Sequence, residues 1–194
     1  MKELVFLLEE KSARALLQSL LPRLLNPLIT PRLIPFEGKQ DLEKQLERRL
    51  RGYQNPNARF IVMRDQDSHP DCLAIKNRLL DICRRSGKIN SYIVRIACKE
   101  LETFYLADLL AVEEALKLKN ISNQQDQRKF RSPDNIQSPS KELQTLTQNA
   151  YQKIDGSREI GKYLSLENTR SPSFRNLITG IRRLEGELME IHNP

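Results

Sequence analysis

Residues 60–68 read Phe-Ile-Val-Met-Arg-Asp-Gln-Asp-Ser and give the strongest indication of the fold class. The first four residues are apolar, which is typical of a short buried strand, and two aspartates follow directly. A second apolar run, Leu4 to Leu8, ends in the same way at Glu9. In a parallel sheet the carboxyl ends of the strands meet at one edge, where ligands bind. The two runs therefore predict a sheet with an acidic carboxyl edge.

Two further segments predict the rest of the sheet. Residues 28–36 are apolar but contain Pro31 and Pro35, which favour an edge strand, and Tyr92 to Ala97 is a fourth strand candidate. Segments with helical apolar spacing separate the strands, and one long helix is expected over residues 100–118. Strands that alternate with helices predict an α/β fold with a mostly parallel four-stranded sheet covered on both faces.

The composition divides the chain into three parts. Residues 1–118 form the expected metal-binding core, residues 119–140 are polar and predict a loop or linker, and residues 141–194 predict a helical extension. The last helix is the clearest, because Ser171 can cap it and Pro172 occupies its first turn. Its apolar stripe favours packing on this chain's own core, with docking to a partner protein as the alternative.

The charge balance favours a polyanionic partner. The 194 residues contain 32 Lys and Arg against 25 Asp and Glu, which gives a net charge of +7. Nucleic acid is the first candidate partner, and a solvated basic surface is the alternative. Arg128, Lys129 and Arg131 in the polar segment are candidates for phosphate contacts. No segment approaches the length of a membrane span, so a cytoplasmic protein without membrane contact is expected.

The acidic residues after the first and third strands predict a divalent-metal site. In extended backbone, residues two apart point the same way, so Asp65 and Asp67 are expected to converge with Glu9. A hard cation relieves the repulsion among such carboxylates, and oxygen ligands suit Mg²⁺ or Mn²⁺. Three scattered cysteines and two histidines offer no zinc motif. The alternative is that Asp67 or Ser68 caps the following helix.

Weaker candidates lie near the same edge. Glu100 and Glu102 follow the fourth strand, and on a helix only one of them would join the site, as a metal ligand or a catalytic acid. Stabilising a helix N-terminus is their alternative role. Lys39, after the second strand, would balance transition-state charge, and His69 is a possible proton carrier. A solvated lysine and a surface histidine are the corresponding alternatives.

These residues carry a resemblance to a known group. Glu9 after the first strand and Asp65-Gln66-Asp67 after the third are the pattern of Toprim domains, including those of the overcoming-lysogenisation-defect nucleases. The chain resembles still more closely a family of small bacterial Toprim-like proteins, along the blocks at residues 4–10, 36–39, 64–68, 99–102 and 166–171. The resemblance implies a Rossmann-like core, a neighbouring ATPase of the ABC or structural-maintenance type, and a role in phage defence. The chain departs from the broad pattern at Glu10 and Pro70, where glycines are common.

Three functions compete. The first is a Mg²⁺- or Mn²⁺-dependent nuclease for DNA or RNA, with Glu9 as ligand or general base and Asp65 and Asp67 as ligands. Hydrolysis is favoured over strand passage because no tyrosine-bearing cleavage domain fits in this length. The second is a phosphoacceptor receiver domain, although the fourth strand ends in Ala97-Cys98 and not in Thr or Ser. The third is a non-catalytic subunit that docks an ATPase through the last helix.

Overall fold

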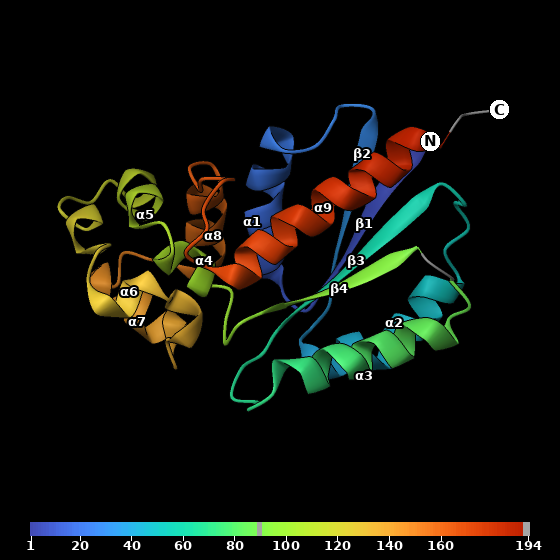
Figure 1. Cartoon of the computed structure of the whole chain (residues 1–194), viewed down its shortest axis with the longest axis horizontal. Coiled ribbons are helices and arrows are strands. Elements are labelled where there is room, and N and C mark those ends of the chain that lie inside the picture. The colour runs from blue at the N-terminus through green and yellow to red at the C-terminus, as the bar shows by residue number, and fades with distance from the viewer. Residues whose placement is uncertain (89–90, 192–194) are drawn as a thin grey trace.

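The computed structural model describes residues 1–88 and 91–191. Its centre is a four-stranded sheet in which all neighbouring strands are parallel, in the order β2-β1-β3-β4 (Figure 1). The strands are β1 (Lys2–Leu8), β2 (Ile29–Pro35), β3 (Ala58–Asp65) and β4 (Tyr92–Ala97). The predicted α/β class and parallel four-stranded sheet are confirmed. The proline-containing strand lies at an edge, as expected, because proline has no N–H for a ladder hydrogen bond.

Helices cover both faces of this sheet, as the sequence predicts. Helices α2 (Lys39–Arg51) and α3 (Cys72–Arg85) lie side by side on one face, and α1 (Lys11–Leu20) and α9 (Pro172–Glu190) lie on the other (Figure 1). Side chains alternate across the strands, so Leu7 and Val62 face α2 and α3 while Leu8 and Met63 face α1 and α9. This alternation also decides which way the residues just beyond the strands point.

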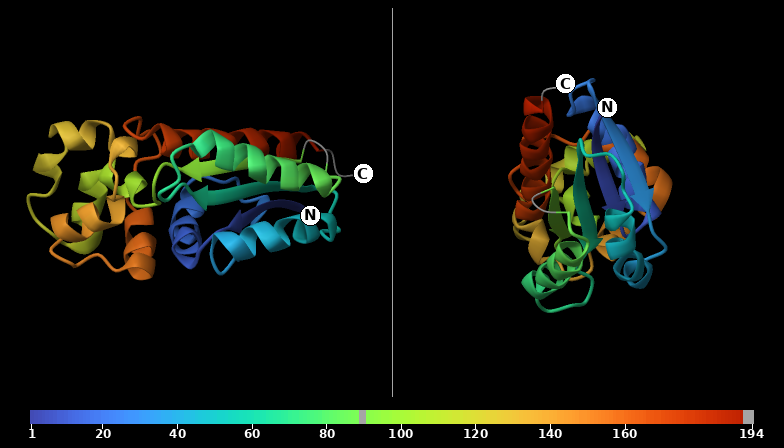
Figure 2. Two further views of the ribbon diagram at one scale, coloured as in Figure 1. Left: turned by 90° about the horizontal axis from the view of Figure 1, so that it is seen from below. Right: turned by 90° about the vertical axis from the view of Figure 1, so that its right-hand side faces the viewer.

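The remaining helices gather beyond the carboxyl edge of the sheet (Figures 1 and 2). They are α4 (Thr103–Leu106), α5 (Leu109–Leu116), α6 (Arg128–Arg131), α7 (Pro139–Leu146) and α8 (Lys153–Gly161), with short 3₁₀ turns at Leu21–Arg23, Ser122–Gln124 and Pro133–Asn135. Residues 119–140, expected as a polar linker, contain two of these turns and α6, and they bury Phe130 completely.

The single long helix expected over residues 100–118 is wrong. The chain breaks between α4 and α5 at Asp108, whose backbone is not helical (φ −143°, ψ 74°). The Asp108 carboxylate accepts a hydrogen bond from the N–H of Ala111 at 3.2 Å and so caps α5. Gln125 fills the gap by accepting from the Leu109 N–H at 2.7 Å and donating to the Leu106 carbonyl at 3.2 Å.

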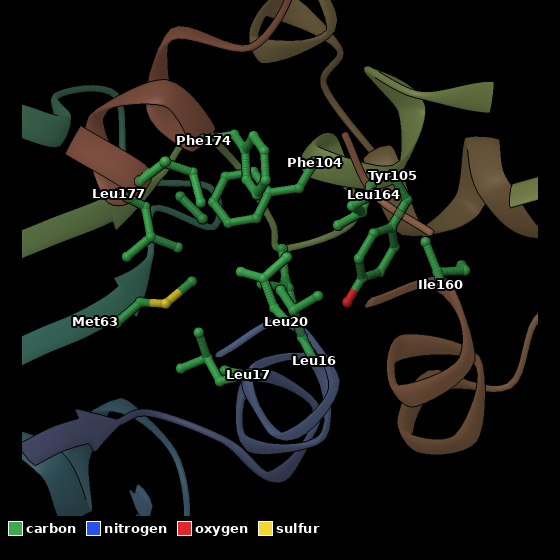
Figure 3. Packing of buried hydrophobic residues seen from close by; sticks show 14 of the residues in the cluster. Leu16, Leu17, Leu20, Met63, Phe104, Tyr105, Ile160, Leu164, Phe174 and Leu177 are labelled. Carbon is green, nitrogen blue, oxygen red and sulfur yellow. The ribbon is translucent and has the colours of Figure 1, made fainter. Parts of the chain in front are cut away.

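The C-terminal helix completes the core. Ser171 caps α9 by accepting from the Phe174 N–H at 3.1 Å, as the sequence predicts. The apolar stripe of α9 is buried, namely Phe174, Leu177, Ile178, Ile181, Leu184 and Leu188. Side chains from α1, β3, α4, α8 and α9 meet in one cluster (Figure 3). The apolar stripe of α9 therefore packs within this chain.

In the described residues, no helix is both long enough and apolar enough to cross a bilayer. The cysteines Cys72, Cys83 and Cys98 are all free.

Candidate metal centre

The parallel strands bring the predicted acids to one edge. Leu8 pairs with Met63 in the register of β1 and β3, so Glu9 and Arg64 lie one step beyond this pair. Asp65 in turn pairs with Ala97 of β4, beside the turn that carries Glu102. Side-chain alternation then divides the acids: Asp65 follows Met63 and points toward the α1 and α9 face, whereas Glu9 follows Leu7 and points toward α2 and α3.

Asp65 is the most strongly perturbed acid of the edge. Its side chain is buried, and one carboxylate oxygen accepts the Leu101 N–H at 3.1 Å. Burial raises the pKa of Asp65 well above its ordinary value, and the negative charges of Glu10, Glu102 and Glu9 raise it further. A carboxyl group surrounded by other carboxyl groups in this way is a site at which added positive charge is stabilising.

Glu102 lies on the same face as Asp65. It is fully buried, and its Oε1 accepts the Tyr151 hydroxyl at 3.0 Å. Its Oε2 has no hydrogen-bond partner among the described residues. Burial raises the pKa of Glu102, and Lys153 counteracts that effect. A buried oxygen without a hydrogen-bond donor is costly, and a bound cation would remove that cost. Glu102 Oε2 is therefore a candidate metal ligand.

Lys153 at the start of α8 carries positive charge into this edge. Its Nζ donates to Glu10 Oε2 at 2.7 Å. Burial lowers the pKa of Lys153, but the acids around it outweigh that effect and the pKa is raised. The sequence analysis missed Glu10, Lys153 and Tyr151. The sequence contains no signal for the last two, because they reach the edge only through the packing of α8 on α1.

Glu9 and Asp67 lie on the other side of the edge. Glu9 Oε2 accepts the Asp65 N–H at 3.0 Å and lies 3.8 Å from Arg64 Nε. Burial raises the pKa of Glu9 and Asp67 raises it further, while the Asp65 N–H and Arg64 act in the opposite sense. Asp67 Oδ2 is 2.9 Å from Lys39 Nζ, so Lys39 lies at the same edge as Asp67.

The expectation that Asp65 and Asp67 point the same way is wrong. That alternation requires extended backbone, whereas Asp67 has a left-handed conformation with φ 55°. The Asp67 N–H donates to the Lys99 carbonyl at 2.6 Å, and Gln66 joins the same two loops by accepting from the Lys99 N–H at 3.2 Å. Contact with the loop after β4 therefore turns Asp67 toward Lys39. The negative charge of Glu9 raises the pKa of Asp65, and the charge of Asp67 raises the pKa of Glu9.

The capping alternative for Asp67 and Ser68 is also wrong. The cap of α3 is Asp71, whose carboxylate accepts the N–H groups of Leu73 and Ala74 at 2.8 and 3.2 Å. His69 Nδ1 accepts the Asp71 N–H at 3.1 Å and so supports the same turn.

Other predicted residues lie elsewhere. Glu100 Oε2 accepts the Ser140 N–H at 2.7 Å, at the N-terminus of α7, and is thus directed away from Glu102. The two glutamates separate because they precede α4 and do not share a helix. Arg128, Lys129 and Arg131 line a separate cavity of about 730 Å³.

The donor set fits a hard divalent cation in chemistry, but the ligands are not fully assembled. All candidate donors are carboxylate oxygens, and Glu102 Oε2 lacks a partner. Within residues 1–88 and 91–191, no three His, Cys, Asp or Glu side chains are placed closely enough to hold a metal ion. Because Asp67 is paired with Lys39, it would have to leave that lysine to share a cation with Glu9.

Comparison with known proteins identifies the family of the chain. The model of the family described as "Domain of unknown function (DUF4276)" matches residues 8–182. The chain belongs to this family. No curated protein matches the sequence.

The fold also has similar solved structures. The C-terminal region of the Burkholderia pseudomallei OLD protein matches with a TM-score of 0.58 and 13% identity, over 96% of this chain and 98% of that one. The C-terminal region of the Xanthomonas campestris pv. campestris OLD protein matches with a TM-score of 0.52 and 14% identity, over 96% of each chain. At such identities the likeness concerns the fold. It confirms the predicted resemblance of this fold to that of the OLD proteins.

Proposed function

We propose that this DUF4276 protein is a cytoplasmic nuclease that hydrolyses phosphodiester bonds with the help of Mg²⁺ or Mn²⁺. The observation that carries the proposal is the buried acidic edge, where Asp65, Glu9, Glu10 and Glu102 lie close enough to raise the pKa of Asp65. Burying carboxylates that repel one another destabilises the fold, so such a cluster indicates a functional site. The fold shared with the OLD C-terminal regions supports the same reading.

The proposal gives each residue a role. Glu9, Asp65 and Asp67 would hold the cation, and Glu102 Oε2 is a further oxygen at the same edge. A bound divalent cation supplies Lewis-acid stabilisation of the negative charge on phosphate. Lys39 would then be free of Asp67 and could donate to a phosphate oxygen.

Lys153 has a separate role on the other side of the edge. Its ammonium group is bonded to Glu10, so it keeps the buried acids from repelling a polyanionic substrate.

The two rival functions have less support. Docking of an ATPase through the last helix would require a free apolar stripe, but the stripe of α9 is buried in this chain's core. A receiver domain would require a fifth strand that ends in lysine, and the described residues form a four-stranded sheet. The resemblance to defence-associated proteins still supports an ATPase partner and a role against phage, through another surface.

Incubation of the purified protein with supercoiled DNA and with structured RNA, each with Mn²⁺, Mg²⁺ or EDTA, tests the proposal. The wild type is expected to cleave at least one substrate only when the metal is present. Asp65→Asn is expected to lose roughly 100-fold or more of that rate. Glu167→Gln, at an exposed position between α8 and α9, serves as the control and should cleave like the wild type. Equal cleavage by Asp65→Asn would contradict the proposed site.

A further inference from the structure

A groove runs from the acidic edge along the outside of α2 and α3. One hollow of about 370 Å³ is lined by Lys39, Asp67 and His69 at the edge. A second hollow of about 810 Å³ continues between the two helices as far as Arg85. Gln40, Glu43 and Arg78 line both hollows, so the two are parts of one groove, which we call the α2–α3 groove. The two helices lie side by side along its length (Figures 1 and 2).

Most of the excess positive charge of the protein lies on these two helices. Together α2 and α3 contain nine Lys and Arg residues against four Asp and Glu, which is a net charge of +5 out of +7 for the whole chain. The charge is therefore concentrated on one face of the sheet, next to the candidate metal centre.

The acidic residues of this face do not neutralise its excess positive charge, because single glutamates are each ion-paired with two arginines. Glu43 is bonded to the buried Arg64 and to Arg78, whose side chain is 69% exposed. Glu47 is shared in the same way between Arg51 and Arg85. Glu47 thus holds two guanidinium groups in place and leaves one positive charge in surplus. Glu43 holds the exposed Arg78 beside Arg64, whose second acidic neighbour is Glu9 at 3.8 Å. Such pre-oriented guanidinium groups suit the binding of phosphate oxygens.

The lining of the groove indicates how a nucleic acid would be bound. Among the residues that line it in the described parts of the chain there is no Phe, Tyr or Trp. Proteins that bind single strands rely on aromatic side chains, on which successive bases stack. A groove with arginine and lysine but without such rings is suited to the phosphate backbone of a duplex, without base readout.

We propose that the α2–α3 groove binds one strand of a nucleic-acid duplex through its phosphates and leads that strand to the acidic edge at Lys39. This inference deepens the proposed nuclease function and rests on it for the role of the edge. It assigns the main nucleic-acid contact to Lys44, Arg78 and Arg85. The earlier candidates Arg128 and Arg131 lie in α6, at the opposite end of the molecule (Figure 1).

Two double variants with the same change of net charge test the inference. Lys44→Ala/Arg78→Ala removes two exposed cations from the groove, and Arg128→Ala/Arg131→Ala removes two exposed cations from α6. Binding of a fluorescein-labelled duplex of about 20 base pairs, a length that spans roughly two helical turns, is followed by anisotropy. The titrations are made in EDTA at several salt concentrations between about 50 and 200 mM.

The groove variant is expected to bind the duplex roughly 50- to 100-fold more weakly near 0.1 M salt, because each lost phosphate contact removes about 0.9 from the slope of log affinity against log salt. Its slope should accordingly fall by about 2, while the α6 variant keeps the slope of the wild type. Equal weakening in both variants, stronger weakening in the α6 variant, or no binding of duplex by the wild type would overturn the inference. Tighter binding of a single strand of equal length than of the duplex would also overturn it.

The same data separate this inference from the proposed function. Binding is measured without metal, so a protein that binds duplex in the groove but never cleaves it would contradict the nuclease and leave the groove standing. A protein that cleaves in a metal-dependent way, but whose groove variant binds like the wild type, would contradict the groove alone.

Discussion

Glu3→Gln is expected to destabilise the protein at neutral pH but hardly in acid. Glu3 is 5% exposed at the start of β1, at the end of the sheet opposite the candidate metal centre. Its carboxylate accepts hydrogen bonds from Arg32 at 2.9 Å, Tyr53 at 2.9 Å and Asn55 at 2.8 Å. Burial raises the pKa of Glu3, but the bonds from Asn55, Arg32 and Tyr53 together outweigh burial and lower it.

The size of the effect follows from these contacts. In glutamine an NH₂ group replaces one accepting oxygen, so either Arg32 or the pair Tyr53 and Asn55 loses its acceptor, at a cost of about 1–3 kcal/mol. The lost ion pair with the half-exposed Arg32 adds up to about 1 kcal/mol. A total of about 1–4 kcal/mol corresponds to a fall in Tm of roughly 2–16 °C for a chain of this size.

The destabilisation caused by Glu3→Gln should depend on pH. Because the pKa of Glu3 is lower in the folded protein than in the unfolded chain, its contribution to stability is present above the unfolded value, near 4.5, and is lost as the pH falls through the folded value. Thermal melts followed by circular dichroism from pH 7 to pH 3 should therefore show a difference between wild type and variant that narrows in acid. Glu159→Gln, on the exposed side of α8, should melt like the wild type throughout. A constant difference across this range would refute the reasoning.

Three further substitutions test the packing of the helices. Ile181→Ala should lower the free energy of unfolding by about 2–5 kcal/mol, because Ile181 lies on the apolar stripe of α9 and is fully buried. If it unfolds at the same urea concentration as the wild type, α9 is not part of the core. Gly161→Ala should also destabilise, since the added Cβ would lie 2.8 Å from the Leu16 carbonyl oxygen where α8 meets α1. Gly186→Ala in α9 meets no neighbour within 4 Å and should instead stabilise by about 0.5–1 kcal/mol, so an equal gain in both variants would contradict the close approach.

The sheet was predictable because local sequence signals indicate each of its strands. Apolar runs followed by charged residues indicate β1 and β3, prolines mark β2 as an edge strand, and β4 is an apolar run interrupted by Arg95. Gly52 and Gly87 follow α2 and α3 as stop signals. The parallel arrangement then brings Glu9, Asp65 and Asp67 to one edge without further information. The helix break at Asp108 could also have been predicted. An aspartate within a segment of helical apolar spacing is a candidate N-cap residue, at which one helix ends and another begins.

The internal geometry of the edge was not predictable from local sequence. Asp67 takes its left-handed conformation in contact with Lys99, and the two residues are 32 positions apart. Lys153 reaches Glu10 across more than 140 residues, through helix packing that apolar periodicity does not specify. Periodicity indicates which face of a helix is buried, but not which partner covers it.

Calorimetric titration of Mn²⁺ into the metal-free protein measures whether the acidic edge of the sheet binds a metal ion. The wild type is expected to bind Mn²⁺. Asp65→Asn keeps an oxygen for the Leu101 N–H but removes the charge, and it should bind Mn²⁺ more than about 100-fold more weakly, since even outer partners of metal ligands contribute 10- to 100-fold. Glu47→Gln, on the surface of α2, should bind like the wild type. Equal Mn²⁺ affinity in the wild type and Asp65→Asn would contradict a metal centre at this edge of the sheet.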